Sequence, residues 1–189
     1  MERPHYHTFD EIFALLYGPY RASCMRLLDD NRARFEQAPG SRHNHQTWIG
    51  GYLDHVREAL NYAILIYHAE MATGRPMPFR LDDALVVIFL HDLEKPWLYD
   101  LVDGEWRKNE ALQGKAARAA FRWMKIAEYG IRLTPEMQNA LMYAEGEGDD
   151  YRSDRRVANE MAAFVHICDT WSARVRHNYP KAGDPWSGR

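Results

Sequence analysis

The feature that most constrains this chain is an uninterrupted apolar run, Leu85–Leu90, that leads directly into His91 and Asp92. Such a run indicates a buried element, and Pro96 disfavours helical geometry at the residue before it. We therefore expect His91 and Asp92 at the inner end of a buried helix. Two ionisable groups are costly there unless they are bound. An imidazole beside a carboxylate suits a divalent metal ion, and a buried His–Asp hydrogen bond is the alternative.

Two other segments carry residues of the same chemical types. Residues 50–56 read Gly-Gly-Tyr-Leu-Asp-His-Val, and residues 166–174 contain Asp169 and end in Ala-Arg. Together with residues 91–95, His-Asp-Leu-Glu-Lys, they resemble the His…His-Asp…Asp pattern of the HD superfamily of metal-dependent phosphohydrolases. The motifs are most similar to those in the HD domains of bacterial 3′–5′ exoribonucleases, and the resemblance extends over residues 43–176.

The resemblance implies one metal site formed by four ligands: His55, His91, Asp92 and Asp169. Imidazole and carboxylate ligands admit Mn, Co, Fe, Ni, Zn or Mg as the divalent ion and do not choose among them. Such a set leaves coordination positions open for water and for a substrate phosphoryl oxygen. We therefore expect one divalent metal ion as the cofactor.

Many HD domains bind a second metal through further histidines. By the family pattern these would fall near residues 114–115 and 144–145, where this chain has no histidine. A His-bridged site for two metals is therefore not expected. Glu145 is interpreted either as a carboxylate that reaches the metal or its water, or as an ordinary acid at a helix end. His166 has no motif support and is interpreted as structural.

Four further residues are candidates for contact with the substrate. Lys95 occupies the lysine position of the HD motif, so we expect it to be catalytic and to bind phosphate; a surface lysine is the alternative. Glu94 would orient the attacking water or only balance nearby charges. His45 is either a catalytic contact or an ordinary loop histidine. Arg174, expected on the same face as Asp169, would bind a phosphate or pair with an acid.

Every long segment has helical periodicity, which predicts an all-α, single-domain helical bundle of the HD type. The turn signal Asp103-Gly104 predicts one short hairpin or loop excursion. We expect an N-terminal helical region over residues 1–42 packed on the core, an HD domain over 43–178 and a mobile tail over 179–189. The helices are predicted within 9–38, with a break at Gly18-Pro19, and at 48–72, 81–91, 109–129, 135–145 and 154–178.

Composition narrows the classes of function. A chain of 189 residues with 46% hydrophobic residues can bury one core, and its net charge of −3 gives no general attraction to nucleic acid. Two cysteines are too few for a disulfide framework. The N-terminus has no apolar signal segment, and no apolar run reaches the ~20 residues of a membrane span. We expect a cytoplasmic protein without a membrane partner, and its oligomeric state stays open.

The resemblance implies a hydrolase that acts on an ester bond of a small phosphorylated substrate, a nucleotide. A 3′–5′ exonuclease or a cyclic-nucleotide phosphodiesterase is the first alternative, because these enzymes share the site. The acidic balance of the chain disfavours nucleic acid as the partner. A non-catalytic protein that binds metal or nucleotide to regulate a partner is the second alternative.

Overall fold

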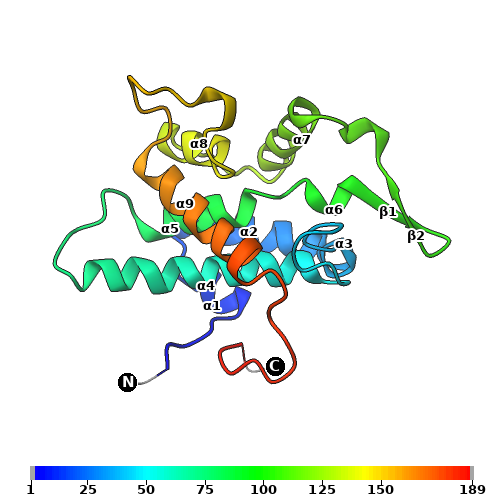
Figure 1. Cartoon of the computed structure of the whole chain (residues 1–189), viewed down its shortest axis with the longest axis horizontal. Helices are drawn as coiled ribbons and strands as arrows, with labels where there is room; N and C mark the ends of the chain where they lie inside the picture. Colours follow the sequence, from blue (N-terminus) through cyan, green and yellow to red (C-terminus); the bar gives the residue numbers. More distant parts are fainter. Residues whose placement is uncertain (1–2, 188–189) are drawn as a thin grey trace.

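The longest helix, α4 (Gly51–Met71), is the element around which the others are arranged in this computed structural model, which describes residues 3–187 (Figure 1). Two helices, α5 (Leu81–Leu90) and α9 (Glu160–Thr170), pack on α4 and on each other. Nearly every residue of α4 from Gly51 to Ile64 is buried. A helix that is buried on all sides must carry apolar residues all round it, and any polar residue within it needs a partner.

The predicted buried helix in front of His91 is confirmed. All residues of α5 from Ala84 to Leu90 are at most 1% exposed, and His91 caps its C-terminus. The chain then turns and forms the short helix α6 (Lys95–Leu98). The expectation that Lys95 avoids helical geometry was wrong. Pro96 lies in the first turn of α6. Backbone N–H groups in the first turn have no partner within the helix, so a proline there costs no hydrogen bond.

The N-terminal residues contribute to the same core as the rest of the chain. They form α1 (Phe9–Ala14), α2 (Gly18–Asp30) and α3 (Arg32–Gln37), so the predicted break at Gly18-Pro19 is confirmed. Phe13 of α1 packs edge-to-face on Phe89 of α5, with ring centroids 5.0 Å apart. The helices therefore cover one shared core, as the single-domain prediction requires.

The predicted excursion is a two-stranded hairpin that projects from one end of the bundle (Figure 1). Strand β1 (Tyr99–Val102) pairs antiparallel with β2 (Glu105–Lys108), and the two turn residues, Asp103 and Gly104, both have positive φ. A two-residue turn of this kind matches the twist of the strands. The chain continues through η1 (Glu110–Leu112), α7 (Lys115–Glu128), α8 (Pro135–Met142) and η2 (Gly148–Asp150).

The last predicted helix, 154–178, is shorter in the structure. Helix α9 begins at Glu160, where Asn159 caps it, and a π-helical segment, η3 (Trp171–Val175), follows it. Residues 151–156 are exposed, so they have no apolar face that a helix could bury. The prediction was wrong there because charged residues have helical propensity but nothing to pack against.

The C-terminal segment lies beside the N-terminus (Figure 1). The indole N–H of Trp186 donates to the Pro4 carbonyl over 3.0 Å, and its ring contacts Tyr6 and Tyr62. The mobility predicted for residues 179–189 stays a prediction, and residues 188–189 lie outside the described part of the chain. The all-α prediction with one hairpin is confirmed. Within residues 3–187, every helix is too short or too polar to cross a bilayer.

The Gly-Gly pair in front of α4 has a steric cause. Gly50 caps the helix with φ +82°, a conformation that favours glycine. A Cβ on Gly51 would lie 1.9 Å from the carbonyl oxygen of Gln46, so the loop over residues 39–46 crosses directly against the first turn of α4. This close approach sets the distance between that loop and His55.

Gly51→Ala is expected to lower the free energy of unfolding by about 3 kcal/mol, because the added methyl group overlaps a backbone atom that cannot move alone. Gly74→Ala is the control, since Gly74 has φ +81° but no atom within 4 Å of a Cβ. Backbone strain alone should cost about 1 kcal/mol there. Urea unfolding measures both, and equal losses in the two variants would contradict the steric account.

Candidate metal centre

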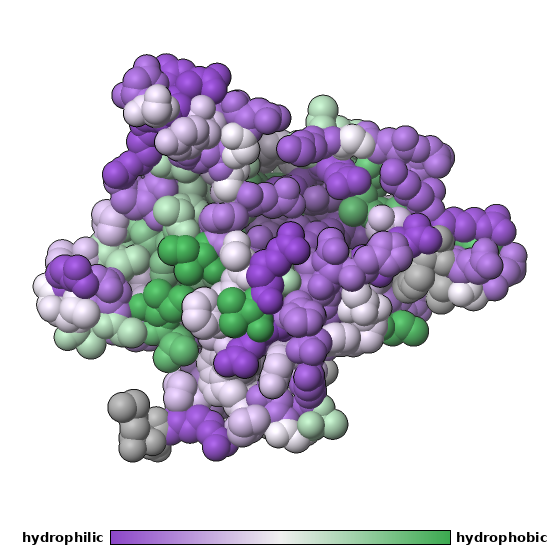
Figure 2. Space-filling model, viewed as in Figure 1, coloured by the Kyte–Doolittle hydropathy of each residue, from purple (hydrophilic) through white to green (hydrophobic). Residues whose placement is uncertain are grey.

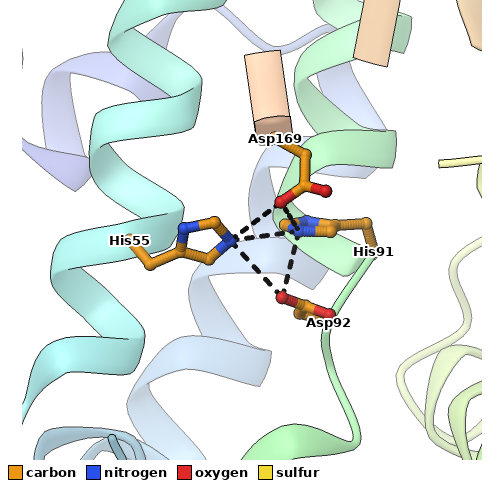
Figure 3. Close-up of side chains that lie close together, drawn as sticks. All are labelled: His55, His91, Asp92 and Asp169. Atoms are coloured by element: carbon orange, nitrogen blue, oxygen red, sulfur yellow. Dashed lines mark hydrogen bonds and ion pairs between the residues drawn. The ribbon is translucent and has the colours of Figure 1, made fainter. Parts of the chain in front are cut away.

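Three helices bring four ionisable side chains to one point. His55 lies in the second turn of α4, His91 and Asp92 follow α5, and Asp169 lies in the last turn of α9. Figure 3 shows that all four side chains point toward one another. One ligand atom from each lies within 4.8 Å of the others, and the group could hold a metal ion. All four residues named by the HD resemblance are therefore together.

The spacing of the ligand atoms fits a single small ion. Nε2 of His55 lies 3.3 Å from Nε2 of His91, 3.4 Å from Oδ2 of Asp92 and 3.2 Å from Oδ1 of Asp169. Nε2 of His91 lies 3.1 Å and 3.4 Å from the same two oxygens. Atoms that share one ion at bond lengths of about 2.0–2.2 Å are separated by about 3.0–3.5 Å.

The hydrogen bonds around His91 leave its metal-facing nitrogen free. Its Nδ1 lies 2.7 Å from the Ile88 carbonyl oxygen, which can only accept, so Nδ1 carries the proton and donates. Nε2 then has the lone pair that a metal requires. Nδ1 of His55 lies 3.0 Å from the Ser172 hydroxyl, so Nε2 of His55 also faces the centre.

The buried group stabilises positive charge. His55, His91 and Asp92 are each at most 1% exposed. Oδ2 of Asp92 is buried and receives no well-aligned hydrogen bond from residues 3–187, although the Lys95 ammonium lies against it. Burial lowers the pKa of His91, but the carboxylates of Asp92 and Asp169 outweigh burial and raise that pKa to about 10.

The group lies at the base of a cleft of about 730 Å³. Figure 2, in the view of Figure 1, shows a recess with hydrophilic walls in the upper middle of the molecule. A cleft of this volume accommodates a small molecule. Its wall combines the loop before α4 with residues from α6, β1, α7, the turn after α8, α9 and η3. The charged or titratable members are Arg42, His43, His45, Asp92, Lys95, Tyr99, Arg118, Glu145, His166, Asp169 and Arg174.

Lys95 and Arg174 both line this cleft, as the sequence predicts. Burial alone would lower the pKa of Lys95. The adjacent Asp92 carboxylate outweighs burial, so the pKa is raised overall and the ammonium stays charged. Arg174 is exposed and lies five residues after Asp169, within the π-helical segment. A π turn has a wider repeat than an α turn, which brings residues five apart to the same side.

His45 also lines the cleft, and it is a neutral imidazole. Burial, together with the nearby charges of His55 and Lys95, lowers its pKa to about 3. Its ring centroid lies 4.6 Å from that of His55, and its Nδ1 lies 2.8 Å from Oε1 of Gln46. His45 therefore packs directly on a candidate ligand, and its catalytic role stays a prediction.

Glu94 lies away from the metal group. Its two carboxylate oxygens accept from Nε and Nη2 of Arg122 over 2.9 Å and 3.0 Å. It lines an adjoining cavity of about 210 Å³, which shares Arg118 and Glu145 with the cleft, and it does not line the cleft itself. This arrangement matches the charge-balancing interpretation, and the structure does not bring Glu94 to the position that a water-orienting catalytic residue would need.

Sequence reasoning missed several residues of the site. Arg42 and Arg118 line the cleft, but no motif marks them, because only the folded chain brings α7 opposite the loop before α4. His166, interpreted as structural, has Nδ1 2.9 Å from the Ala144 carbonyl oxygen and also lines the cleft beside Glu145. Ser172 was missed although it lies only three residues after the candidate ligand Asp169.

Comparison of this chain with family models, with curated proteins and with solved structures gives no match. The fold and the site themselves define the class: an all-α protein with a buried group of two histidines and two aspartates that could hold a metal ion. Among residues 3–187, this is the one group of three or more His, Cys, Asp or Glu side chains whose ligand atoms lie close enough together to share a metal ion.

Metal analysis should find about one divalent ion per chain in the wild type, and Asp169→Asn should lower metal affinity by about 100-fold or more, because a ligand charge is lost while the shape is kept. Glu145→Gln is the matched control, since Glu145 lines the same cleft outside the four-residue group. Elemental analysis after dialysis measures both. Two tightly bound ions, or full occupancy in Asp169→Asn, would contradict the single site.

Proposed function

We propose that this protein is a metal-dependent phosphohydrolase of the HD type, which hydrolyses a phosphoester of a small substrate, a nucleotide. The observation that carries the proposal is a buried His₂Asp₂ group at the base of a cleft whose wall is rich in cations. His55, His91, Asp92 and Asp169 would hold a divalent ion there. Such an ion would supply Lewis acidity, which activates water and polarises a phosphoryl oxygen at neutral pH.

Lys95 binds the phosphoryl group. Its ammonium lies against Oδ2 of Asp92, so it is next to the metal group and inside the cleft. With a divalent ion held by Asp92, the Lys95 ammonium would direct its hydrogen-bond donors toward an anion in the cleft, as a compact point charge on a flexible stem.

The charges of the cleft wall favour a substrate with two or more negative charges. Arg42, Lys95, Arg118 and Arg174 are cations, and the carboxylates in the described wall are Glu145 and the two ligands Asp92 and Asp169. A bound divalent ion neutralises the two ligands. The remaining excess of positive charge suits a phosphomonoester or a polyphosphate better than a cyclic diester with one charge.

His45 acts as a hydrogen-bond acceptor in this proposal. A pKa of about 3 makes an imidazole a weak base near neutral pH, so it cannot hold a proton taken from water. With Nδ1 engaged by Gln46, its Nε2 lone pair can accept from water or from a substrate hydroxyl. His45 thereby orients a group in the cleft without taking up its proton.

The test of this function is a substrate panel with metal-loaded protein: mononucleotides, nucleoside triphosphates, cyclic nucleotides and short oligonucleotides. We expect phosphate or pyrophosphate release from the first two classes, and no release after chelation or in Asp169→Asn. Cleavage of oligonucleotides or cyclic nucleotides alone would favour the nuclease or phosphodiesterase alternative. Nucleotide binding without any hydrolysis would replace the proposal with a regulatory binding protein.

Lys95→Met should keep the metal, because Lys95 is not a ligand in this proposal. It should lower kcat/KM by about 10²–10³, equivalent to roughly 2.7–4 kcal/mol of lost transition-state stabilisation. Methionine keeps an unbranched side chain of nearly the same length and removes the ammonium group with its charge and donors. Lys95→Glu should be slower still, since it repels the same phosphate. A wild-type rate in Lys95→Glu would show that the phosphate binds elsewhere.

Arg118→Ala and Arg174→Ala should each raise KM about tenfold, because each removes one charge-assisted contact to the substrate. The turnover number should change little, since neither residue lies in the metal group. Arg21→Ala, an exposed arginine on α2 outside the cleft wall, is the control. Steady-state kinetics on the best substrate measures all three. Unchanged KM in both cleft variants would contradict the assignment of Arg118 and Arg174 as substrate contacts.

A further inference from the structure

Ser172 connects the candidate ligand His55 to a buried carboxyl group that the proposed reaction does not use. Ser172 is 0% exposed, and its Oγ lies 3.0 Å from Nδ1 of His55. The same Oγ lies 3.3 Å from the backbone carbonyl oxygen of His55 and 3.4 Å from Oε2 of Glu58. Glu58 itself is 3% exposed and lies one helical turn after His55 on α4.

We infer that Ser172 and Glu58 are positioning residues for the metal centre: they hold the proton of His55 on Nδ1, so that Nε2 is free to bind the ion. This inference rests on the metal-binding part of the proposed function. It adds the requirement that His55 carries its proton on Nδ1, which the four-residue group alone does not impose.

The donor and acceptor count around Ser172 leads to this conclusion. A hydroxyl has one proton, and two oxygen acceptors compete for it: the His55 carbonyl oxygen and the Glu58 carboxyl group. Nε2 of Gln46 also lies 3.4 Å from Oγ, and it can only donate to it. Once that proton is donated to either, Oγ can only accept from Nδ1 of His55. If Ser172 instead donated to Nδ1, Nε2 of His55 would carry a proton directed at Nε2 of His91, 3.3 Å away, and could not bind a metal.

Gln46 fixes the acceptor side of this network. Its Nε2 lies 3.1–3.4 Å from Oε2 of Glu58 and from the backbone oxygens of Ser172, Arg176 and Tyr179. Backbone oxygens can only accept, so the NH₂ group of Gln46 must face them. Its Oε1 then accepts from Nδ1 of His45, as their 2.8 Å separation indicates. Gln46 is 0% exposed and has φ +37°.

The network explains two costly features of the fold. Burial raises the pKa of Glu58 to about 8, although the hydrogen bond from Ser172 opposes the shift. The π-helical segment η3 turns Ser172 into the core, while Asp169 and Arg174 face the cleft. Buried carboxyl groups and π turns are both found frequently at functional sites. A residue that orients a ligand in this way is commonly worth 10- to 100-fold in metal affinity.

The test compares Ser172→Val with Ser172→Thr, because valine and threonine have the same shape and only threonine keeps the hydroxyl. Affinity for Zn²⁺ and Co²⁺ is measured by competition with a chelator, and the Co²⁺ visible spectrum reports the ligand set. We expect Ser172→Val to bind about 10- to 100-fold more weakly than Ser172→Thr, with a changed spectrum. Equal affinities and spectra for the two variants would overturn the inference.

Glu58 provides a second pair. Glu58→Gln keeps an acceptor oxygen and should keep affinity within about threefold of the wild type, whereas Glu58→Met removes it and should weaken binding about tenfold. Wild-type affinity in both Glu58→Met and Ser172→Val would refute the positioning role and leave the proposed function intact. Failure of the wild type to bind Zn²⁺ or Co²⁺ would instead refute the proposed function.

A measurement on the unaltered protein covers the case in which the Ser172 variants do not fold. Nitrogen NMR of the Zn²⁺ form should show a slowly exchanging proton on Nδ1 of His55 and coordination through Nε2. Slow exchange is expected because that proton is buried in the bond to Ser172. Coordination through Nδ1, or an Nδ1 proton that exchanges as fast as that of an exposed histidine, would overturn the inference.

Discussion

Two imidazole nitrogens and two carboxylate oxygens meet inside the core of this protein, and the rest of the site depends on that meeting. The atoms of each His–His and His–Asp contact lie 3.1–3.4 Å apart. At these distances the four acceptor atoms repel one another unless positive charge lies between them. The carboxylates of Asp92 and Asp169 raise the pKa of His91 to about 10, in line with this preference for positive charge. Under the proposed function, a divalent ion would supply that charge, and the cleft would give a substrate access to the ion.

The fold holds these atoms at fixed positions. α4, α5 and α9 pack on one another through apolar residues, so none of the three helices can move without opening the core. Gly51 lets the loop before α4 approach closely enough for Gln46 to reach Glu58 and the backbone of η3. Packing therefore determines where the ligand atoms lie, and the buried polar network determines which of them carry protons.

The sequence predicted the parts of the molecule that have a local signal. The apolar run before His91 marked a buried helix, and the motif resemblance pointed to His55 and Asp169, which the fold brings together with His91 and Asp92. The cleft wall could not be predicted in the same way, because Arg118 gains its place only through the packing of α7. The start of α9 was missed because charged residues with helical propensity precede Glu160 but have no apolar partner. The sequence alone indicated which motif residues carry the candidate chemistry, but it did not indicate which distant residues the fold brings to the cleft wall.

The most direct test of the central claim is anomalous diffraction from crystals grown with Mn²⁺. The expected result is one strong anomalous peak enclosed by Nε2 of His55, Nε2 of His91 and the carboxylates of Asp92 and Asp169, at the 2.0–2.3 Å distances roughly typical of such bonds. The contradictory result is density at this point without an anomalous signal, with the four side chains joined by protons or water alone. In that case the buried group would be a structural hydrogen-bond network.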